Sequence, residues 1–178
     1  MLIKIILVLA VLIVVVLIIA ATRSADFSCS RSMVISAPTS AVFAEANDYR
    51  KWVIWSPFEK DPAMKRTFSG APTGTGAVYE WSGNREVGEG RATIMESRPG
   101  ELVRMKLEFV RPFAGTNMAE LTFKPMGAQT MVTWSFTGKN NFICRVVGVF
   151  MNMEKMVGGQ FEQGLASLKA LVEKSVAK

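Results

Sequence analysis

The hydrophobic residues of this 178-residue chain follow three successive patterns, the first unbroken, the second alternating and the third helical. Positions 5–19 read IILVLAVLIVVVLII and contain no polar residue. A helix over residues 2–21 is roughly 30 Å long, which matches the hydrocarbon core of a bilayer. Lys4 and Arg23 flank it, where their side chains can reach lipid headgroups. The pattern predicts one transmembrane helix over residues 1–22.

A cleaved signal peptide is the alternative for this segment. The apolar run is longer than the usual signal-peptide core of about 7–15 residues. Ile18 or Ile19 would also occupy the −3 position before a cut at Ala20 or Ala21, where a small residue is needed. We therefore expect an uncleaved, single-pass anchor in a bacterial cell membrane. Because the preceding tail is so short, we expect the downstream domain to be exported, in a periplasmic or extracytoplasmic location.

An alternating pattern comes next and is strictest over 103–109, where Val103, Met105, Leu107 and Phe109 alternate with charged residues. Such alternation is typical of an antiparallel strand with one buried face. The same alternation, or a weaker form of it, covers positions 27–37, 64–70, 77–81, 92–94, 119–124 and 132–137. Turn residues rich in Gly, Pro and Asn separate these segments. The pattern predicts seven strands in one curved antiparallel sheet.

Two segments have helical spacing. A short helix is expected to begin at Pro38, with Thr39 or Ser40 as its cap. A second helix is predicted from about residue 142 to residue 176, with apolar residues at three- and four-residue steps from Val146 to Leu171. Its four glycines weaken it and suggest a bend or a close contact. Its apolar stripe must pack on the concave face of the sheet.

Composition removes several classes of function. The chain has no His and two Cys, which excludes Ser-His-Asp triads, Cys-His dyads, His-ligated metals and structural zinc sites. Its 21 basic and 15 acidic residues are scattered, whereas nucleic-acid binding requires a basic cluster. We expect no metal, no cofactor and no nucleic-acid partner. The excess of positive charge suits contact with anionic lipid headgroups instead.

Several segments resemble one known family. They are, in chain order, Trp52-Val53-Ile54-Trp55-Ser56-Pro57-Phe58, Asp61-Pro62, Gly74-Thr75-Gly76-Ala77-Val78-Tyr79-Glu80-Trp81-Ser82-Gly83-Asn84, Gly88-Glu89-Gly90, Arg111-Pro112-Phe113, Val132-Thr133-Trp134 and Phe161-Glu162-Gln163-Gly164-Leu165. Over residues 27–174 the chain resembles the polyketide cyclase/dehydrase-like branch of the SRPBCC (START/Bet v 1-like) superfamily. The resemblance implies an α+β helix-grip fold, in which the sheet wraps the C-terminal helix and leaves a hydrophobic cavity.

The resemblance and the inward faces of the predicted elements together suggest a ligand pocket with aromatic, aliphatic and thioether walls. Its candidate residues are Trp52, Trp55, Phe58, Tyr79, Trp81, Met105, Leu107, Phe109, Phe123, Trp134, Phe136, Met153, Val157 and Phe161. Each of these residues could equally be ordinary core, because protein interiors normally pack without voids. Trp52, Trp55 and Phe58 are expected on a loop that closes one end.

Superfamily members bind lipids, sterols and other apolar molecules, and some are cyclases or assist protein partners. We therefore expect membrane-tethered binding of a hydrophobic small molecule or lipid. A cyclase or dehydratase is the alternative, with Tyr79 as a proton donor and Arg111 at the cavity entrance. An interaction module that assists a protein at the membrane is a further alternative, with an unknown partner. Glu59 and Asp61 are expected to be solvated loop acids.

The implied fold makes the first and last strands neighbours, which suggests a disulfide between Cys29 and Cys144 if the domain is exported. The sequence thus predicts an anchor over residues 1–22, a tether over 23–26 and a helix-grip domain over 27–178. The anchor suits the predicted function, because a tethered domain meets membrane-derived ligands at high local concentration.

Overall fold

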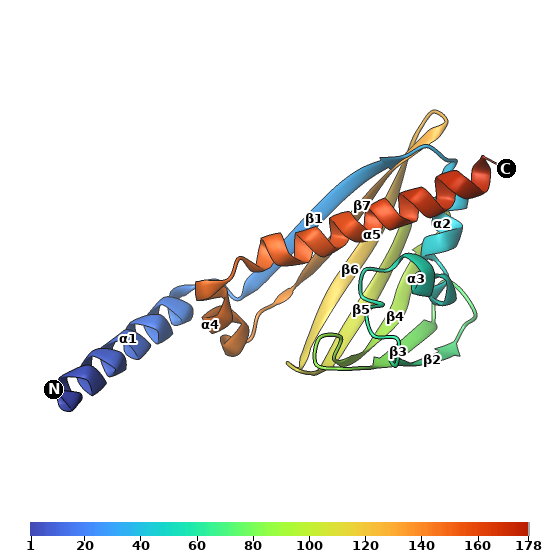
Figure 1. Cartoon of the computed structure of the whole chain (residues 1–178). Coiled ribbons are helices and arrows are strands. Elements are labelled where there is room, and N and C mark those ends of the chain that lie inside the picture. Colours follow the sequence, from blue (N-terminus) through green and yellow to red (C-terminus); the bar gives the residue numbers. More distant parts are fainter. Residues whose placement is uncertain (178) are drawn as a thin grey trace.

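The computed structural model describes residues 1–177 and has the predicted α+β helix-grip architecture (Figure 1). Seven antiparallel strands form one curved sheet in the order β1-β7-β6-β5-β4-β3-β2. The strands are β1 (Asp26–Ile35), β2 (Lys65–Gly70), β3 (Ala77–Ser82), β4 (Glu89–Arg98), β5 (Leu102–Arg111), β6 (Gly115–Met126) and β7 (Gln129–Lys139). The helices are α1 (Leu2–Thr22), α2 (Thr39–Ala46), α3 (Tyr49–Trp55), α4 (Phe142–Phe150) and α5 (Met153–Val176).

The alternation in the sequence produces the two faces of the sheet. On β7, Val132 and Trp134 are buried while the intervening Thr133 is not, and Trp134 is paired with Leu121 of β6, which is also buried. Consecutive strands β2 to β7 form a meander, and β1 closes it by pairing with β7 along its whole length. All seven predicted strands are present, with ends shifted by a few residues.

Helix α5 packs on part of the concave face and lies closest to β1 (Figure 1). Its residues Phe161, Leu165, Leu168 and Val172 recur at three- and four-residue steps, and each is at most 2% exposed. The predicted apolar stripe is therefore the main contact between the helical layer and the sheet.

The prediction of one continuous C-terminal helix over residues 142–176 is wrong, because the structure has two helices there. Helix α4 ends at Phe150, Met151 is extended, and α5 starts after Asn152. The side chain of Asn152 accepts a hydrogen bond from the backbone N–H of Lys155 and so caps a new helix. The break thus comes from an N-cap residue. Gly158 lies inside α5, where the close contact expected for a glycine is present, because a Cβ atom there would overlap the guanidinium of Arg31.

The first predicted helix is confirmed as α2, although its N-cap is Pro38 and neither Thr39 nor Ser40 caps it. The loop expected around Trp52 and Trp55 is wrong, because both residues lie on α3. The side chain of Asp48 caps this helix by accepting from the N–H of Arg50. Trp52 and Trp55 thereby point into the interior from a fixed helix.

The predicted disulfide is not formed, since Cys29 and Cys144 are both free thiols. Cys29 is buried on β1, and its Sγ lies 3.7 Å from the carbonyl oxygen of Glu154 at the start of α5. Cys144 lies in the first turn of α4, which leaves the end of β7 and packs against α1. Cys29 thus lies between β1 and α5, whereas Cys144 lies on the helix that packs against α1.

Helix α1 has a mean hydropathy of 3.6, and its most apolar stretch is not buried against the rest of the chain. Length and composition make it capable of crossing a membrane, and a signal sequence has the same features. It extends from the domain at the end where β1 begins and β7 ends (Figure 1).

Two glycines of α5 provide a test of the helix–sheet contact. A Cβ atom at Gly164 would lie 2.7 Å from Pro57 and 2.8 Å from Trp134, whereas one at Gly159 would meet nothing within 4 Å. We expect Gly164→Ala to lower the free energy of unfolding by about 1 kcal/mol, because overpacking outweighs the gain in helix propensity. Gly159→Ala is expected to raise it by about 1 kcal/mol.

Chemical denaturation of the full chain in detergent measures both variants. Stabilisation by both substitutions would show that the helix does not press on Trp134.

Candidate functional site

The concave face of the sheet is closed at one end and partly open at the other. On β5, Met105 is 1% exposed, but Leu107 and Phe109, further along the same inward face, are only half-buried. On β7 the same change occurs between Trp134, which is 2% exposed, and Phe136. The open end is the one where β5 and β7 finish.

The other walls show the same gradient. Inward-facing Trp81 at the end of β3 and Phe27 at the start of β1 are half-buried. On α5, Phe161 is buried, whereas Val157, one turn nearer the start of the helix, is half-buried. These half-buried apolar residues surround the open end, and we call them the mouth: Phe27, Trp81, Leu107, Phe109, Phe136 and Val157.

The closed end is filled by aromatic side chains. The ring of Trp134 stacks on that of Phe161 with centroids 4.5 Å apart and planes 3° from parallel. Trp52 and Trp55 of α3 each meet Trp134 edge-on at 5.7 Å. Edge-to-face and stacked pairs of this kind stabilise a core beyond their buried area. This cluster forms the floor beneath the mouth.

The floor contains polar atoms with no protein partner. The Nε1 atoms of Trp55 and Trp134 and the hydroxyl of Tyr49 are buried and make no hydrogen bond within residues 1–177. By contrast, Trp52 donates to the carbonyl of Ala46 at 2.9 Å. Buried N–H and O–H groups normally have a partner, and leaving one unpaired costs about 1–3 kcal/mol. An oxygen acceptor would satisfy the two indoles.

A buried carboxylate lies beside the floor. The Glu59 side chain is 6% exposed; its Oε1 accepts from the Tyr79 hydroxyl at 2.6 Å, and its Oε2 accepts from Arg66 Nε at 2.7 Å. Asp61, which is also buried, accepts from the backbone N–H groups of Ala63 and Asn84 and so holds two loops together. The expectation that Glu59 and Asp61 are solvated is therefore wrong, because each is held by several donors.

The surroundings of Tyr79 oppose a role as a proton donor. Burial of the ring is the main reason that the pKa of Tyr79 is raised, and the hydrogen bond to Glu59 raises it further. Its proton is directed at the Glu59 carboxylate. Arg111, expected at the entrance, is exposed on β5 and pairs with Glu89 of β4. Tyr79 and Arg111 are thus both engaged with carboxylates of the protein itself.

Asn117 is a polar group at the open end that the sequence analysis missed. It occupies an inward position of β6, in line with Ala119 and Leu121, and is half-buried. A Cβ atom at Gly138 of β7, its ladder partner, would overlap the Asn117 side chain, so the glycine makes room for the amide. The sequence did contain a signal for this residue, because Asn117 is a polar residue in line with the apolar inward positions of β6.

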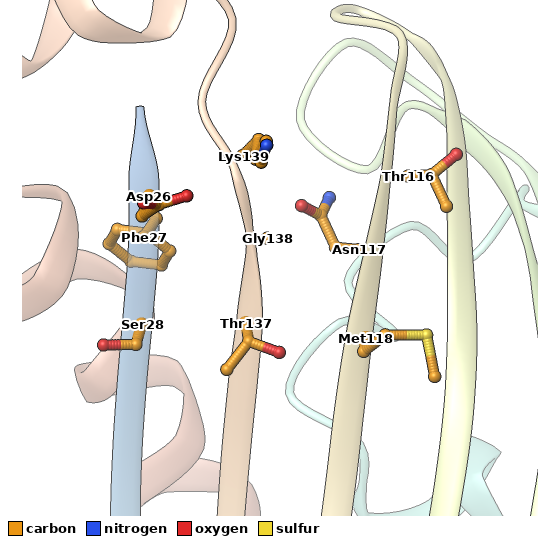
Figure 2. Close-up of a pocket in the computed structure, with 9 residues that line it drawn as sticks. All are labelled: Asp26, Phe27, Ser28, Thr116, Asn117, Met118, Thr137, Gly138 and Lys139. Atoms are coloured by element: carbon orange, nitrogen blue, oxygen red, sulfur yellow. The ribbon is translucent and has the colours of Figure 1, made fainter. Parts of the chain in front are cut away.

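An open hollow of about 470 Å³ lies beside this amide (Figure 2). Figure 2 shows its lining residues at adjoining ends of strands, namely Asp26, Phe27, Ser28, Thr116, Asn117, Met118, Thr137, Gly138 and Lys139. A second hollow of about 590 Å³ lies on the polar side of β2 to β5, where Glu80, Arg91 and Glu108 line it. Each hollow is lined by one residue of the mouth, the first by Phe27 and the second by Trp81.

The predicted pocket residues fall into two groups that differ in solvent exposure. The buried group is Trp52, Trp55, Tyr79, Met105, Phe123, Trp134 and Phe161. The half-buried or exposed group is Phe58, Trp81, Leu107, Phe109, Phe136, Met153 and Val157. The structure thus buries the first group in the core and leaves the second partly or largely exposed to solvent.

Comparison with known proteins identifies the family. Residues 26–173 match the family described as polyketide cyclase / dehydrase and lipid transport. The chain belongs to this family. No significant match to a curated protein was found.

Solved structures share the fold of this cyclase/dehydrase and lipid transport family member. Protein CV1439 from Chromobacterium violaceum is 18% identical, with a TM-score of 0.60 over 82% of this chain and 96% of its own. The Aha1 dimer from Colwellia psychrerythraea is 13% identical, with a TM-score of 0.60 over 83% and 96%. DynU16, from the dynemicin biosynthetic locus, is 14% identical, with a TM-score of 0.58 over 83% and 48%. At these identities the likeness concerns the fold.

The buried carboxylate of Glu59 gives a prediction, for which the more exposed Glu80 of β3 provides the control. Glu59→Gln removes the charge that binds Arg66 and Tyr79, and we expect a loss of about 2 kcal/mol or more in the free energy of unfolding. Glu80→Gln removes an exposed carboxylate paired with Arg91 at 2.9 Å and is expected to cost less than about 1 kcal/mol. Equal losses in denaturation experiments would contradict the buried arrangement.

The two tyrosines of the chain predict a pH dependence. Burial raises the pKa of both Tyr49 and Tyr79 above the usual value of 10.0. Below that pH both residues are protonated in the folded and unfolded states; above it only the unfolded state releases protons. The free energy of unfolding should therefore fall as pH rises above 10.0.

Phenolate absorbance measured against pH tests this directly. We expect tyrosinate to appear only together with unfolding, and Tyr79→Phe to halve the signal. Ionisation of either tyrosine at its ordinary pKa in the folded protein would show that its ring is not buried.

Proposed function

We propose that this protein binds a hydrophobic small molecule or lipid through the mouth while α1 holds the domain at the cell membrane. The observation that carries the proposal is the position of the mouth, at the end of the sheet from which α1 departs. Strand β1 begins at Asp26, which pairs with Lys139 at the end of β7, and only residues 23–25 separate it from α1. A ligand leaving a bilayer would reach this end of the domain first.

The proposed division is an anchor over residues 1–22, a tether over 23–26 and a binding domain over 27–178. Retention of α1, rather than its removal as a signal peptide, is part of the proposal. A short tether raises the effective concentration of the domain beside membrane-derived ligands. An extracytoplasmic location of the domain is part of the same proposal.

The chemistry of the site suggests a mainly apolar ligand with an oxygen acceptor. The mouth presents aromatic and aliphatic side chains, which suit an apolar body. The amide of Asn117 can orient a polar end of the ligand at the mouth. The description of the family includes lipid transport, which agrees with such a ligand.

Binding is favoured over a cyclase or dehydratase activity by the way the polar groups are engaged. Glu59, Arg66 and Tyr79 bind one another, and the phenolic proton of Tyr79 is donated to a carboxylate. A general acid must instead present its proton to the substrate.

A photoactivatable fatty acid provides the test. The full chain in lipid nanodiscs is incubated with the probe and irradiated, and the labelled peptides are identified by mass spectrometry. We expect labels on the peptides of β5, β7 and the start of α5 that carry Leu107, Phe136 and Val157. Native mass spectrometry of the untreated protein should also reveal a co-purifying apolar molecule.

Val157→Trp is expected to fill the mouth and reduce this labelling several-fold. Val176→Trp places the same side chain at the exposed far end of the same helix and should leave labelling unchanged. Labels confined to α1, or equal labelling of the two variants, would overturn the proposal.

A further inference from the structure

Helix α4 is tied to the end of α1 that adjoins the domain. The guanidinium of Arg23 donates to the carbonyl oxygen of Gly148 at 2.6 Å. In the opposite direction, Arg145 donates to the carbonyl oxygens of Ala21 and Arg23, each at 3.3 Å. The two bonds donated by Arg145 satisfy carbonyl groups at the C-terminal end of α1, which have no hydrogen-bond partner within that helix. The position of α4 is therefore fixed relative to the apolar helix.

The exposed side of α4 is apolar. Ile143 is 54% exposed and Phe150 is 72% exposed, and their separation of seven residues places them on one face of the helix. Met151, directly after the helix, is 50% exposed. Large apolar side chains rarely gather at the surface of a soluble domain without a binding role.

Along the sequence, the segment that contains α4 carries only basic charge. Residues 121–153 contain no acidic residue, and Lys139 and Arg145 lie immediately before and within the helix. An amphipathic helix with apolar residues on one side and basic residues nearby is typical of segments that lie in the headgroup region of a bilayer. Because α4 adjoins α1, a bilayer that holds α1 would lie within reach of these side chains.

We propose that α4 is a second membrane-contact element, which lies in the lipid interface and orients the domain with its mouth toward the bilayer. This inference rests on the proposed function, and specifically on α1 being retained as the membrane anchor. Insertion of Ile143 and Phe150 would bury their apolar surface in lipid and would prevent the domain from swinging freely on its tether. The mouth would then exchange ligand with the bilayer over a short path.

Spin labels on the full chain in lipid nanodiscs test the proposal. Labels are attached to Ile143→Cys and Phe150→Cys in a Cys144→Ala background, in which Cys29 is buried and its pKa is raised by burial. Ile54→Cys is the matched control, since Ile54 is 70% exposed on α3, which lies away from α1 (Figure 1). Accessibility is measured to oxygen, which concentrates in lipid, and to a water-soluble nickel chelate.

We expect the two α4 labels to collide with oxygen more often than with the chelate, and the Ile54 label to show the reverse. High accessibility to the chelate on α4 would overturn the proposal in favour of an exposed helix. Low accessibility to both reagents would overturn it in favour of a protein partner or a second copy of the chain.

The two proposals fail in different ways. Lipid-exposed α4 labels combined with no fatty-acid labelling of the mouth would contradict the proposed function alone. Mouth labelling combined with water-exposed α4 labels would contradict the membrane contact of α4 alone.

Discussion

One helix cannot cover the whole concave face of a seven-stranded sheet, and the rest of the molecule is arranged around this constraint. Helix α5 contributes its stripe from Phe161 to Val172, and the rings of Trp52 and Trp55 from α3 complete the closed half. Among the described residues, no comparable element covers the inward side chains at the other end, and those of Leu107 and Phe136 remain half-buried. The half of the concave face that α5 and α3 cover is therefore a dense aromatic floor, and the half that they do not cover is the mouth.

Buried polar groups hold the loops that border this mouth. Glu59 joins the segment after α3 to β2 and β3 through Arg66 and Tyr79, and Asp61 joins it to the β3–β4 loop through the N–H of Asn84. Such groups are costly to bury unless every acceptor is satisfied, and here each carboxylate has at least two donors. Their contribution is to fix the wall, and the apolar side chains next to them provide the contact surface.

The sequence predicted the fold well because its signals are local. Alternation around residues 103–109 and the helical spacing of Phe161, Leu165 and Leu168 report directly which face of each element is buried. Prediction failed where contacts between residues distant in the sequence determine whether a side chain is buried. Glu59 is buried because Tyr79, twenty residues away, donates to it, and no spacing rule reveals that contact. The helix break was missed for another reason, because the Asn152 cap was hidden within a continuous apolar stripe.

The most direct measurement of the central claim is methyl NMR of the full chain in lipid nanodiscs during titration with a fatty acid. If the concave face is open at the end nearest α1, the methyl signals of Leu107 and Val157 shift with saturation, and those of Leu168 and Val172 on the closed half do not. Uniform shifts along α5, or saturable shifts confined to the closed half, would contradict a binding site at the mouth.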